Sequence, residues 1–508
     1  MSHRLRVRAP RPIAVAAGVA VVLVACSGPR VVTTPPPTPA PVAAPAPVAT
    51  VDLTKPPTLG APPSLRPPQI STRELANGLK IVVLEQHELP LVDVILQVRS
   101  GGESDAAGKT GTAALVAAML TEGTTNRTAL QIADQAAYLG IQLNATSGWE
   151  QSNVSLHTPT AQLDSALALF GDVTLRPSFP APDLERVRKV RLTSLQQLRD
   201  RAPAIADRAF ASAVFGEQHP YGRPLAGTEG SLAAITRDEV QRFYTTYYRP
   251  NNATLLVVGD VRPDDVERRA RELFGAWQRG TVPAPATGTS GGAKNTTVVI
   301  VDKPGAAQTS FRLGGVGAPR STSDYFPLQV MNTILGGSYT SRLNQNLRET
   351  HGYTYGAGSG FGLRRSAGPF IASAEVVTAK TDSALIEFIK ELRAVRDTVP
   401  SDELAKAKRY LQLGLPSSFE TTQGIASEFL PLIAYGIPLD FFASAVQQYG
   451  AVTQADVQRV ARQYVNPDRL TIVVVGDRKV IEPGIRALKP GEIVIRDIRD
   501  VLGAPPTP

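Results

Sequence analysis

The 508-residue sequence is poor in the residues that build metal and thiolate sites. It contains one cysteine, Cys26, and five histidines, at positions 3, 87, 157, 219 and 351. A single cysteine excludes an intrachain disulfide and a zinc site made of several thiolates. No two histidines lie three or four residues apart, so none form the pair of ligands on one helix face that many zinc enzymes use.

Charge is also scarce. Charged residues make up 19% of the chain and aromatic residues 6%, while hydrophobic residues make up 43%, which is typical of a folded globular protein long enough for two domains. The formal net charge is +8. Residues 1–25 hold four arginines and no acid, so their removal leaves +4 on 483 residues. With no basic stripe and no aromatic platform, nucleic-acid binding has little support.

The N-terminal segment is typical of a secreted lipoprotein. Its arginines precede a 13-residue apolar run, Ile13–Ala25, which is too short to span a bilayer as a stable helix. The ending Leu-Val-Ala-Cys resembles a lipobox, in which cleavage precedes Cys26 and the thiol is acylated. Several acyl chains anchor a protein firmly, and Ser27 in place of an aspartate favours the outer membrane. We expect a periplasmic lipoprotein of the cell envelope; the alternative is an incidental cysteine.

Composition divides the chain into five segments. Residues 1–25 are the expected signal peptide, and residues 26–70 form a Pro/Ala-rich linker that serves as a semi-rigid spacer. A second stretch rich in Pro, Gly and Ser, residues 281–296, separates an N-terminal domain over 71–280 from a C-terminal domain over 297–500. The expected folded part therefore consists of two regions of similar length.

The two regions repeat one another. Thr236 and Thr453 each stand at a helix N-cap with an acid three residues later, which is the capping-box pattern. In both copies a proline follows the threonine by 14 residues and an aspartate follows the proline by 10. These later residues are Pro250 with Asp260 and Pro467 with Asp477, and the aspartates are expected to form turns. Two matched spacings indicate an internal duplication.

The strand and helix patterns favour an α+β fold. Each region begins with two strands, residues 81–86 and 92–98 in the first and 297–301 and 309–313 in the second, followed by long helical segments. His87 and Glu88 are expected in a hairpin turn. We predict two homologous domains, each a mostly antiparallel sheet with helices packed on one face, and the motif His219-Pro220-Tyr221-Gly222 as a structural loop that packs Tyr221.

Three motifs of the first region resemble a known family. They are Asn77–Lys80 (NGLK), Gly108–Ala113 (GKTGTA) and Met119–Thr124 (MLTEGT), and they frame a helix as in the inverzincins, the pitrilysin/insulinase family that includes the mitochondrial processing peptidase. In active members H-x-x-E-H on this helix binds zinc and activates water. The resemblance places Ala114, Ala117 and Ala118 at those three positions. It places the third ligand near Thr193 and Ser194, so we expect no metal or other cofactor in this chain.

The second region resembles the other signature of that family, an Arg and a Tyr seven residues apart. Arg348 and Tyr355 have this spacing, and the resemblance implies that they contact the substrate carbonyl and stabilise its oxyanion. The alternative is that Arg348 pairs with an acid at a helix end and Tyr355 is half buried in a strand. Gly336 and Gly337 are expected either to form a tight turn with positive φ or to form a substrate-sensing loop.

Three hypotheses for function follow. In the first, the chain is a catalytically incomplete subunit. It pairs with an insulinase-family subunit that carries zinc, encloses a chamber with it, and lends Arg348 and Tyr355 in trans to the hydrolysis of peptides bound by strand addition. In the second, it is a non-enzymatic peptide-binding or scaffold homodimer of the same fold. An independent peptidase of another mechanism has the least support, because the sole cysteine is assigned to lipidation.

Overall fold

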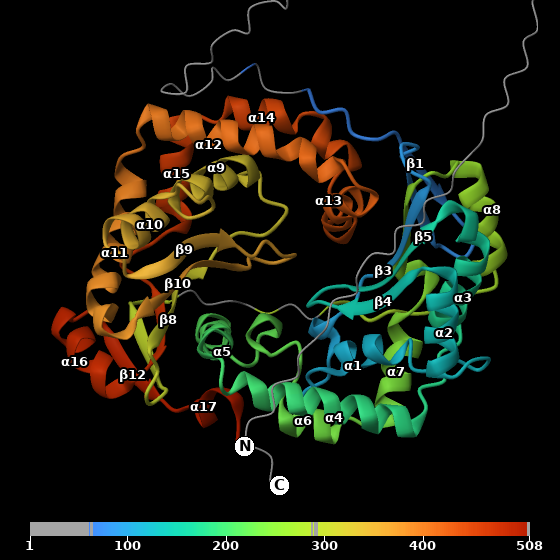
Figure 1. Cartoon of the computed structure of the whole chain (residues 1–508), viewed down its shortest axis with the longest axis horizontal. Coiled ribbons are helices and arrows are strands. Elements are labelled where there is room, and N and C mark those ends of the chain that lie inside the picture. The colour runs from blue at the N-terminus through green and yellow to red at the C-terminus, as the bar shows by residue number, and fades with distance from the viewer. Residues whose placement is uncertain (1–59, 61–63, 286–287, 289–292, 505–508) are drawn as a thin grey trace, which may run out of the picture. The chain divides into compact units, whose positions relative to one another are not determined.

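Apolar runs in the two halves of the chain form two six-stranded sheets in a computed structural model (Figure 1). The structure describes residues 60, 64–285, 288 and 293–504, so the signal segment, Cys26 and most of the first linker lie outside the described residues. The strands of the first sheet are β1 (Ile70–Glu74), β2 (Lys80–Glu85), β3 (Leu91–Val98), β4 (Gln142–Ser147), β5 (Ser152–Pro159) and β6 (Ala253–Gly259). The strands of the second are β7 (Thr297–Asp302), β8 (Gln308–Val316), β9 (Thr354–Phe361), β10 (Pro369–Val377), β11 (Thr471–Gly476) and β12 (Glu492–Arg496).

The strand orders confirm the duplication. The first sheet runs β1-β2-β6-β3-β5-β4 and the second β12-β7-β11-β8-β10-β9. Five strands match in the two sheets, β2-β6-β3-β5-β4 and β7-β11-β8-β10-β9. In each set the first two strands are parallel and every later pair is antiparallel. The outermost strand on one side differs, because β1 precedes β2 and pairs antiparallel, whereas β12 ends the half and pairs parallel.

The predicted hairpin turn at His87 and Glu88 is wrong. Strands β2 and β3 do form, but β6 lies between them and pairs with both. The connection therefore crosses over the end of β6. His87 Nδ1 lies 2.8 Å from Asp260 Oδ1, just after β6, and this contact ties the crossing segment to the strand beneath it.

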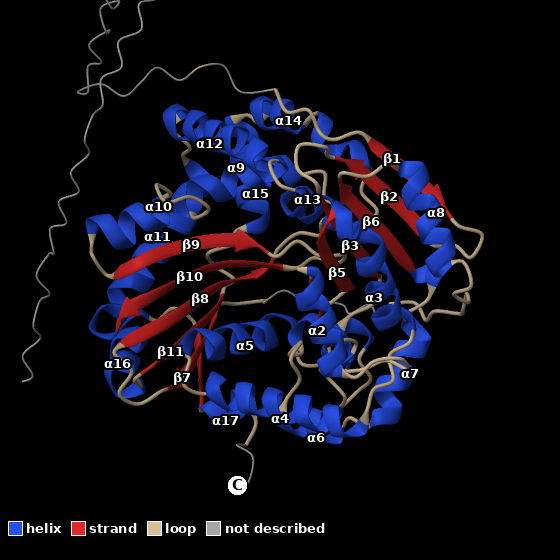
Figure 2. Ribbon diagram, turned by 45° about the vertical axis from the view of Figure 1, so that its right-hand side comes forward, coloured by secondary structure: helices blue, strands red, loops and turns tan. Residues whose placement is uncertain are grey.

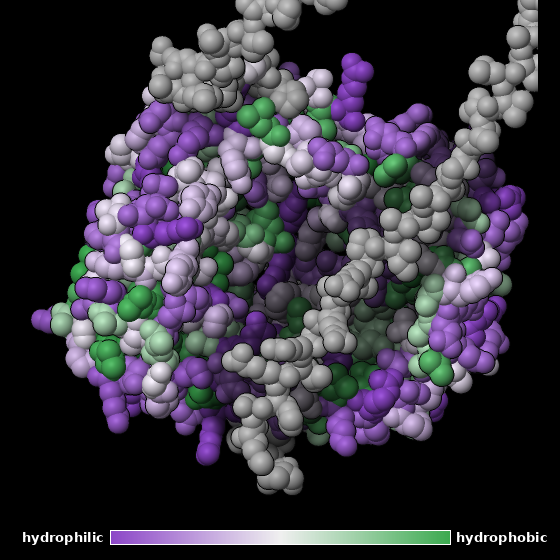
Figure 3. All heavy atoms as spheres, viewed as in Figure 1, coloured by the Kyte–Doolittle hydropathy of each residue, from purple (hydrophilic) through white to green (hydrophobic). Residues whose placement is uncertain are grey.

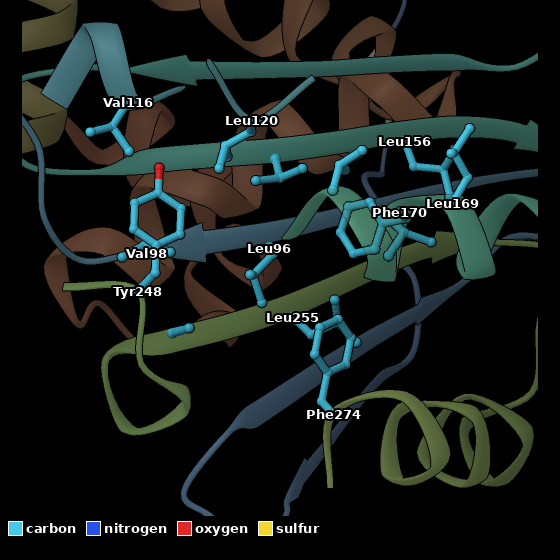
Figure 4. Packing of buried hydrophobic residues seen from close by; sticks show 14 of the residues in the cluster. Leu96, Val98, Val116, Leu120, Leu156, Leu169, Phe170, Tyr248, Leu255 and Phe274 are labelled. Atoms are coloured by element: carbon cyan, nitrogen blue, oxygen red, sulfur yellow. The ribbon is translucent and has the colours of Figure 1, made fainter. Parts of the chain in front are cut away.

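Helices of the same half cover one face of each sheet, and the architecture is the predicted two-domain α+β fold. The helices of the first half are α1 (Thr112–Met119), α2 (Ala129–Leu139), α3 (Leu163–Leu175), α4 (Ala181–Leu198), α5 (Ala202–Phe215), α6 (Glu229–Ala234), α7 (Arg237–Tyr247) and α8 (Pro263–Phe274). Figure 4 shows how Val116 and Leu120 from the region of α1 meet Leu96 and Val98 of β3 and Phe170 of α3 in the first core.

The helices of the second half follow the same plan. They are α9 (Tyr325–Leu335), α10 (Arg342–Asn344), α11 (Thr381–Asp397), α12 (Ser401–Gly414), α13 (Thr422–Tyr435), α14 (Ala445–Ala451), α15 (Gln454–Tyr464), α16 (Arg478–Leu488) and α17 (Ile498–Leu502). Both predicted capping boxes form: the Thr236 hydroxyl accepts from the Glu239 amide before α7, and the Thr453 hydroxyl accepts from the Asp456 amide before α15. None of the described helices is long and apolar enough to cross a membrane.

Each half of the chain contributes one helix that packs on the sheet of the other half. Helix α5 of the first half packs on the second sheet, where Phe210 meets Val473 and Val475 of β11. Helix α13 of the second half packs on the first sheet, where Phe429 joins Leu256 and Val258 of β6. Figure 2 shows both helices against the strands of the opposite half. Each sheet is therefore covered on both faces, by helices of its own half on one face and by a helix of the other half on the opposite face.

Candidate functional site

Helix α1 is held in place by a buried carboxylate. Asp105 accepts hydrogen bonds from the amides of Gly111, at 2.7 Å, and Ala113, at 2.8 Å, where the helix begins. Burial raises the pKa of Asp105 to about 7, although these backbone donors act in the opposite direction. Gly111 has φ 94°, the left-handed region in which glycine avoids strain. The start of α1 is thus fixed in position and direction.

The face of α1 that would carry the family's zinc ligands holds only methyl groups. Ala117 is buried at 1% exposure, and Ala114 and Ala118 are half-buried. Alanine is the best helix former, so the helix stays intact without the ligands. The three positions at which we expect the motif therefore offer no metal ligand, while the helix itself is well formed.

An arginine of α4 approaches this face instead of a carboxylate. Arg191 Nη2 donates to the carbonyl oxygen of Ala114 at 2.8 Å, and burial lowers the pKa of this arginine. Thr193 and Ser194, the expected positions of the third ligand, hydrogen-bond to carbonyls of their own helix at 3.0 Å each. In the described part of the chain, no group of three His, Cys, Asp or Glu residues could hold a metal ion. The alanine side chains offer no ligand atom, and the positive charge of Arg191 would repel a zinc ion, so these residues do not fit zinc.

Arg348 lies in a π-helical turn, Gln345–Thr350, that continues α10. Its side chain is 36% exposed; Nε lies 3.3 Å from Glu349 Oε1, and the guanidinium lies 4.8 Å from the centre of the Tyr339 ring. The Tyr339 hydroxyl donates to the same carboxylate at 3.4 Å. The alternative that Arg348 pairs with an acid at a helix end is therefore realised in this structure, through its neighbour Glu349.

Tyr355 lies on strand β9 with 87% of its surface exposed, so the interpretation as a half-buried strand aromatic is wrong. Among the described residues, its side chain makes no hydrogen bond and no ring contact, and the Arg348 guanidinium lies over Tyr339 instead. Tyr339, 61% exposed beside Arg348, is the residue that sequence reasoning missed. The sequence distance between Tyr339 and Arg348 does not predict this contact, because the ring reaches the guanidinium only once the loop between them has folded.

The Gly336-Gly337 turn does not need positive φ. Gly336 has φ −158°, and Gly337 is absent from the glycines with positive φ. The physical reason for glycine is close approach: a Cβ on Gly336 would overlap the backbone of Ser359 on β9, and one on Gly337 would press on the Asn332 side chain. The prediction of a left-handed turn is thus wrong. Whether the loop senses substrate stays a prediction.

The edge strands of the two sheets differ in accessibility. On β9, the amide of Ser359 donates to the Gly336 carbonyl and the amide of Ala357 donates to Asn344 Oδ1, each at 3.1 Å. These contacts occupy the outer side of β9. Among the described residues, no other segment hydrogen-bonds to the backbone on the outer side of β4, the edge of the first sheet, and α1 lies against this strand. An added strand would therefore meet free backbone groups at β4.

A polar lock joins the halves beside α1. Arg364 and Arg365, in the β9–β10 loop, enter a slot of the first half, where the Arg364 guanidinium lies 3.7 Å from the centre of the Trp149 ring. Arg365 Nη1 donates to Glu103 at 2.7 Å, and its amide donates to Glu150 at 3.0 Å. Glu150 also accepts from the Tyr221 hydroxyl. Tyr221 is buried, as predicted for the His219–Gly222 loop, and burial and the Glu150 contact raise its pKa.

Two family models match the chain, and together they span most of its folded part. Residues 80–229 match Insulinase (Peptidase family M16), and residues 234–411 match Peptidase M16 inactive domain. The chain belongs to peptidase family M16.

Relatives of this M16 homologue include proteins of both kinds. An uncharacterized zinc protease of Mycobacterium bovis is 30% identical over 400 residues, which cover 77% of this chain and 90% of the relative. The non-peptidase homolog YmxG of Helicobacter pylori is 22% identical over 417 residues, which cover 80% and 94%. A solved peptidase M16 inactive domain from Pseudomonas fluorescens has a TM-score of 0.75 at 26% identity, covering 80% of this chain and 98% of that one.

This M16 homologue is a catalytically incomplete member of its family. The match of residues 234–411 to the inactive domain and the similarity to the solved inactive domain agree with the two-domain α+β architecture. The first half matches the insulinase model, and Ala114, Ala117 and Ala118, which the sequence resemblance places at the ligand and general-base positions, lie on α1.

Proposed function

We propose that this M16 homologue is the zinc-free subunit of a heterodimeric peptidase in the cell envelope. The observation that carries the proposal is the contrast between the two halves. The motif face of α1 is reduced to alanine, whereas Arg348 and Tyr355 remain exposed. A partner of the same family with an intact H-x-x-E-H helix would supply zinc, and Arg348 and Tyr355 would donate to the developing oxyanion in trans.

Two further features support this function. Arg348 lies in a π-helical turn, a rare conformation that is frequent at functional sites. The open edge of β4 suits an extended peptide added as a further strand, since its outer backbone groups have no partner among the described residues. The substrates would be short or unfolded peptides, and lipidated Cys26 would hold the subunit at the outer membrane.

The test is reconstitution. We expect the purified chain to show no peptidase activity alone and to support activity when mixed with a zinc-bearing M16 subunit encoded beside it or co-purified from the native envelope. Arg348→Ala should lower kcat of the mixture about 10²-fold to 10³-fold, the range for loss of one oxyanion donor. Arg393→Ala is a matched control, because Arg393 is an exposed arginine of the second half that pairs only with exposed Asp468.

An unchanged kcat for Arg348→Ala would remove the in-trans role. The second candidate function, a non-enzymatic peptide-binding or scaffold homodimer, is favoured by the ion pair that already engages Arg348 with Glu349. A stable homodimer on sizing, with no co-purifying partner and no metal in the native preparation, would support that candidate.

A further inference from the structure

A cavity of about 900 Å³ lies beyond the C-terminal end of α13, on the face of the first sheet that this helix covers. Helix α13 ends at Tyr435, and Gly436 follows in the left-handed region with φ 64°. The chain turns away at this glycine, so α13 leaves the last stretch of the face uncovered. The walls of the cavity are the turn, residues 432–439, together with the end of β1 and the starts of β2 and β6.

This face of the sheet changes from apolar to cationic where α13 stops. Beneath the helix, Val82 and Leu84 of β2 belong to the apolar cluster that α13 completes. Because side chains alternate along a strand, Lys80 lies on the same face as Val82, two residues nearer the uncovered end. Arg99, directly after β3, lines the cavity as well. The uncovered part of the face therefore carries two cations.

These two cations have no counter-ion. Among the described residues, the side chains of Lys80 and Arg99 make no ion pair and no hydrogen bond. The other two cations of the lining are engaged, since Arg73 pairs with acids of α8 and Arg365 pairs with a buried glutamate. Glu74 is the single acid of the lining; it stands opposite Lys80 in the β1–β2 ladder but forms no ion pair with it. An anion in the cavity would therefore meet two positive charges that are free to bind it.

The duplicated half shows that the fold does not require these cations. The matching registers of the two sheets place Thr297 at the position of Lys80 and Val316 at the position of Arg99. Val316 packs against the apolar cluster that contains Tyr221, so the equivalent place in the second half is filled by the chain itself. The first half differs from its own repeat in having a cavity with two unpaired cations at this place.

Another wall of the cavity is apolar. It comes from the last turn of α13 and the loop after it, with the half-buried side chains of Ile433, Ile437 and Leu439. A cavity of this size with an apolar wall and a few charged groups is typical of a small-molecule site. The apolar wall suits a hydrocarbon chain, and the cations suit an anionic group at the end of that chain.

We propose that this cavity binds an amphiphilic anion, with its apolar chain against the α13 turn and a carboxylate or phosphate head on Lys80 and Arg99. Both head groups are recognised by the same chemistry, because each accepts charge-assisted hydrogen bonds from lysine and arginine. A free fatty acid and a phosphorylated lipid are the two sources of such a ligand. The inference goes beyond the proposed function and does not depend on it, since binding needs neither a partner subunit nor turnover.

The test is calorimetric titration of the full chain with decanoate and with decyl phosphate, each below its micelle concentration. Butanoate, which has the same head as decanoate and a shorter chain, should bind at least tenfold more weakly because less apolar surface is buried. Decyltrimethylammonium, which has the same chain and a positive head, should also bind at least tenfold more weakly. The tighter of decanoate and decyl phosphate identifies the head group, and either order supports the site. No binding of both anions, or equal binding of decyltrimethylammonium, would overturn the proposal.

A double variant tests the two cations. Lys80→Thr with Arg99→Val introduces the residues that the second half carries at these positions, so the fold should persist. It should weaken decanoate and decyl phosphate at least tenfold, through loss of the charge-assisted hydrogen bonds. Lys80→Gln alone, at an exposed side chain, should weaken both severalfold and gives the same test if the double variant unfolds. Arg262→Gln, at an exposed arginine outside the cavity, is the matched control and should leave both affinities unchanged. If the double variant keeps its melting temperature and binds decanoate as tightly as the wild type, the cavity is not the site.

Discussion

The polar lock between the halves gives a quantitative prediction for Glu103→Gln. Glu103 is 4% exposed and accepts from Arg365 of the other half at 2.7 Å. Burial raises the pKa of this carboxyl from 4.5 to about 7, the Arg365 contact lowers it by less, and the nearby charge of Glu150 adds to the rise. The folded protein therefore holds a proton on Glu103 at pH values where the unfolded chain has lost it.

The sign and size of the effect follow from proton linkage. The stabilising contribution of protonated Glu103 is fully present below pH 4.5 and is lost as the pH rises through about 7. Because one pKa unit corresponds to about 1.4 kcal/mol, the difference between the two values corresponds to about 3 kcal/mol of unfolding free energy. Glutamine is neutral at every pH and has the same shape, so the variant should not lose this contribution.

Urea denaturation at pH 4.5 and pH 8 measures the difference. We expect Glu103→Gln and the wild type to have similar unfolding free energies at pH 4.5, and the variant to be more stable by about 3 kcal/mol at pH 8. Glu88→Gln is the control, since this side chain is exposed and should follow the wild type at both pH values. If Glu103→Gln and the wild type lose stability equally between the two pH values, the buried, protonatable lock is refuted.

Two further predictions concern the altered sites. Gly336→Ala should lower the unfolding free energy by about 1–3 kcal/mol, the usual cost of overpacking, because the new Cβ would overlap the backbone of β9. Gly360→Ala is the control, since a Cβ there meets nothing within 4 Å. Equal melting temperatures of the two variants would contradict the close approach at Gly336. Restoring the motif with Ala114→His, Ala117→Glu, Ala118→His and Ser194→Glu should give weak zinc binding while Arg191 is present, and at least tenfold tighter binding with Arg191→Ala added. Equilibrium dialysis with metal analysis checks this, and tight zinc binding with Arg191 intact would contradict the role given to its charge.

Local features could be predicted from the sequence because their causes are local. Thr236 and Thr453 form their capping boxes through contacts three residues apart. Ala114, Ala117 and Ala118 lie on one helix, α1, as their spacing predicts, whereas their place in the zinc motif stays a prediction. The hairpin at His87 failed because strand order depends on β6, which lies more than 150 residues later and inserts between its neighbours.

The features that sequence reasoning missed depend on contacts between distant segments. Arg365 and Glu103 are 262 residues apart, and Arg191 reaches Ala114 across 77 residues. The exchange of α5 and α13 between the sheets has no local signature, since an amphipathic helix carries the same pattern whichever sheet it covers. Tyr339 belongs to this group, because its ring lies near Arg348 only once the loop between α9 and α10 has folded.

The helix exchange bears on what a partner would have to provide. Because α5 covers the second sheet and α13 the first, the apolar faces of both sheets are buried within one chain. On the face seen in Figure 3, hydrophilic side chains predominate around the rim, with smaller hydrophobic patches between them. A partner is therefore not required to complete the hydrophobic core.

The exposed groups around Arg348 need a different explanation from the core. Tyr355 and Tyr339 keep most of their surface in solvent, and the Arg348–Glu349 pair is partly exposed, so its contribution to stability is small. Stability accounts for the alanines of α1, which form helix well, but it does not account for the exposure of Tyr339 beside Arg348 or of Tyr355 on β9. Tyrosine and arginine are the residues that contribute most at binding surfaces. The proposed function would account for this exposure, since it assigns these side chains a contact with the peptide or with the zinc-bearing subunit.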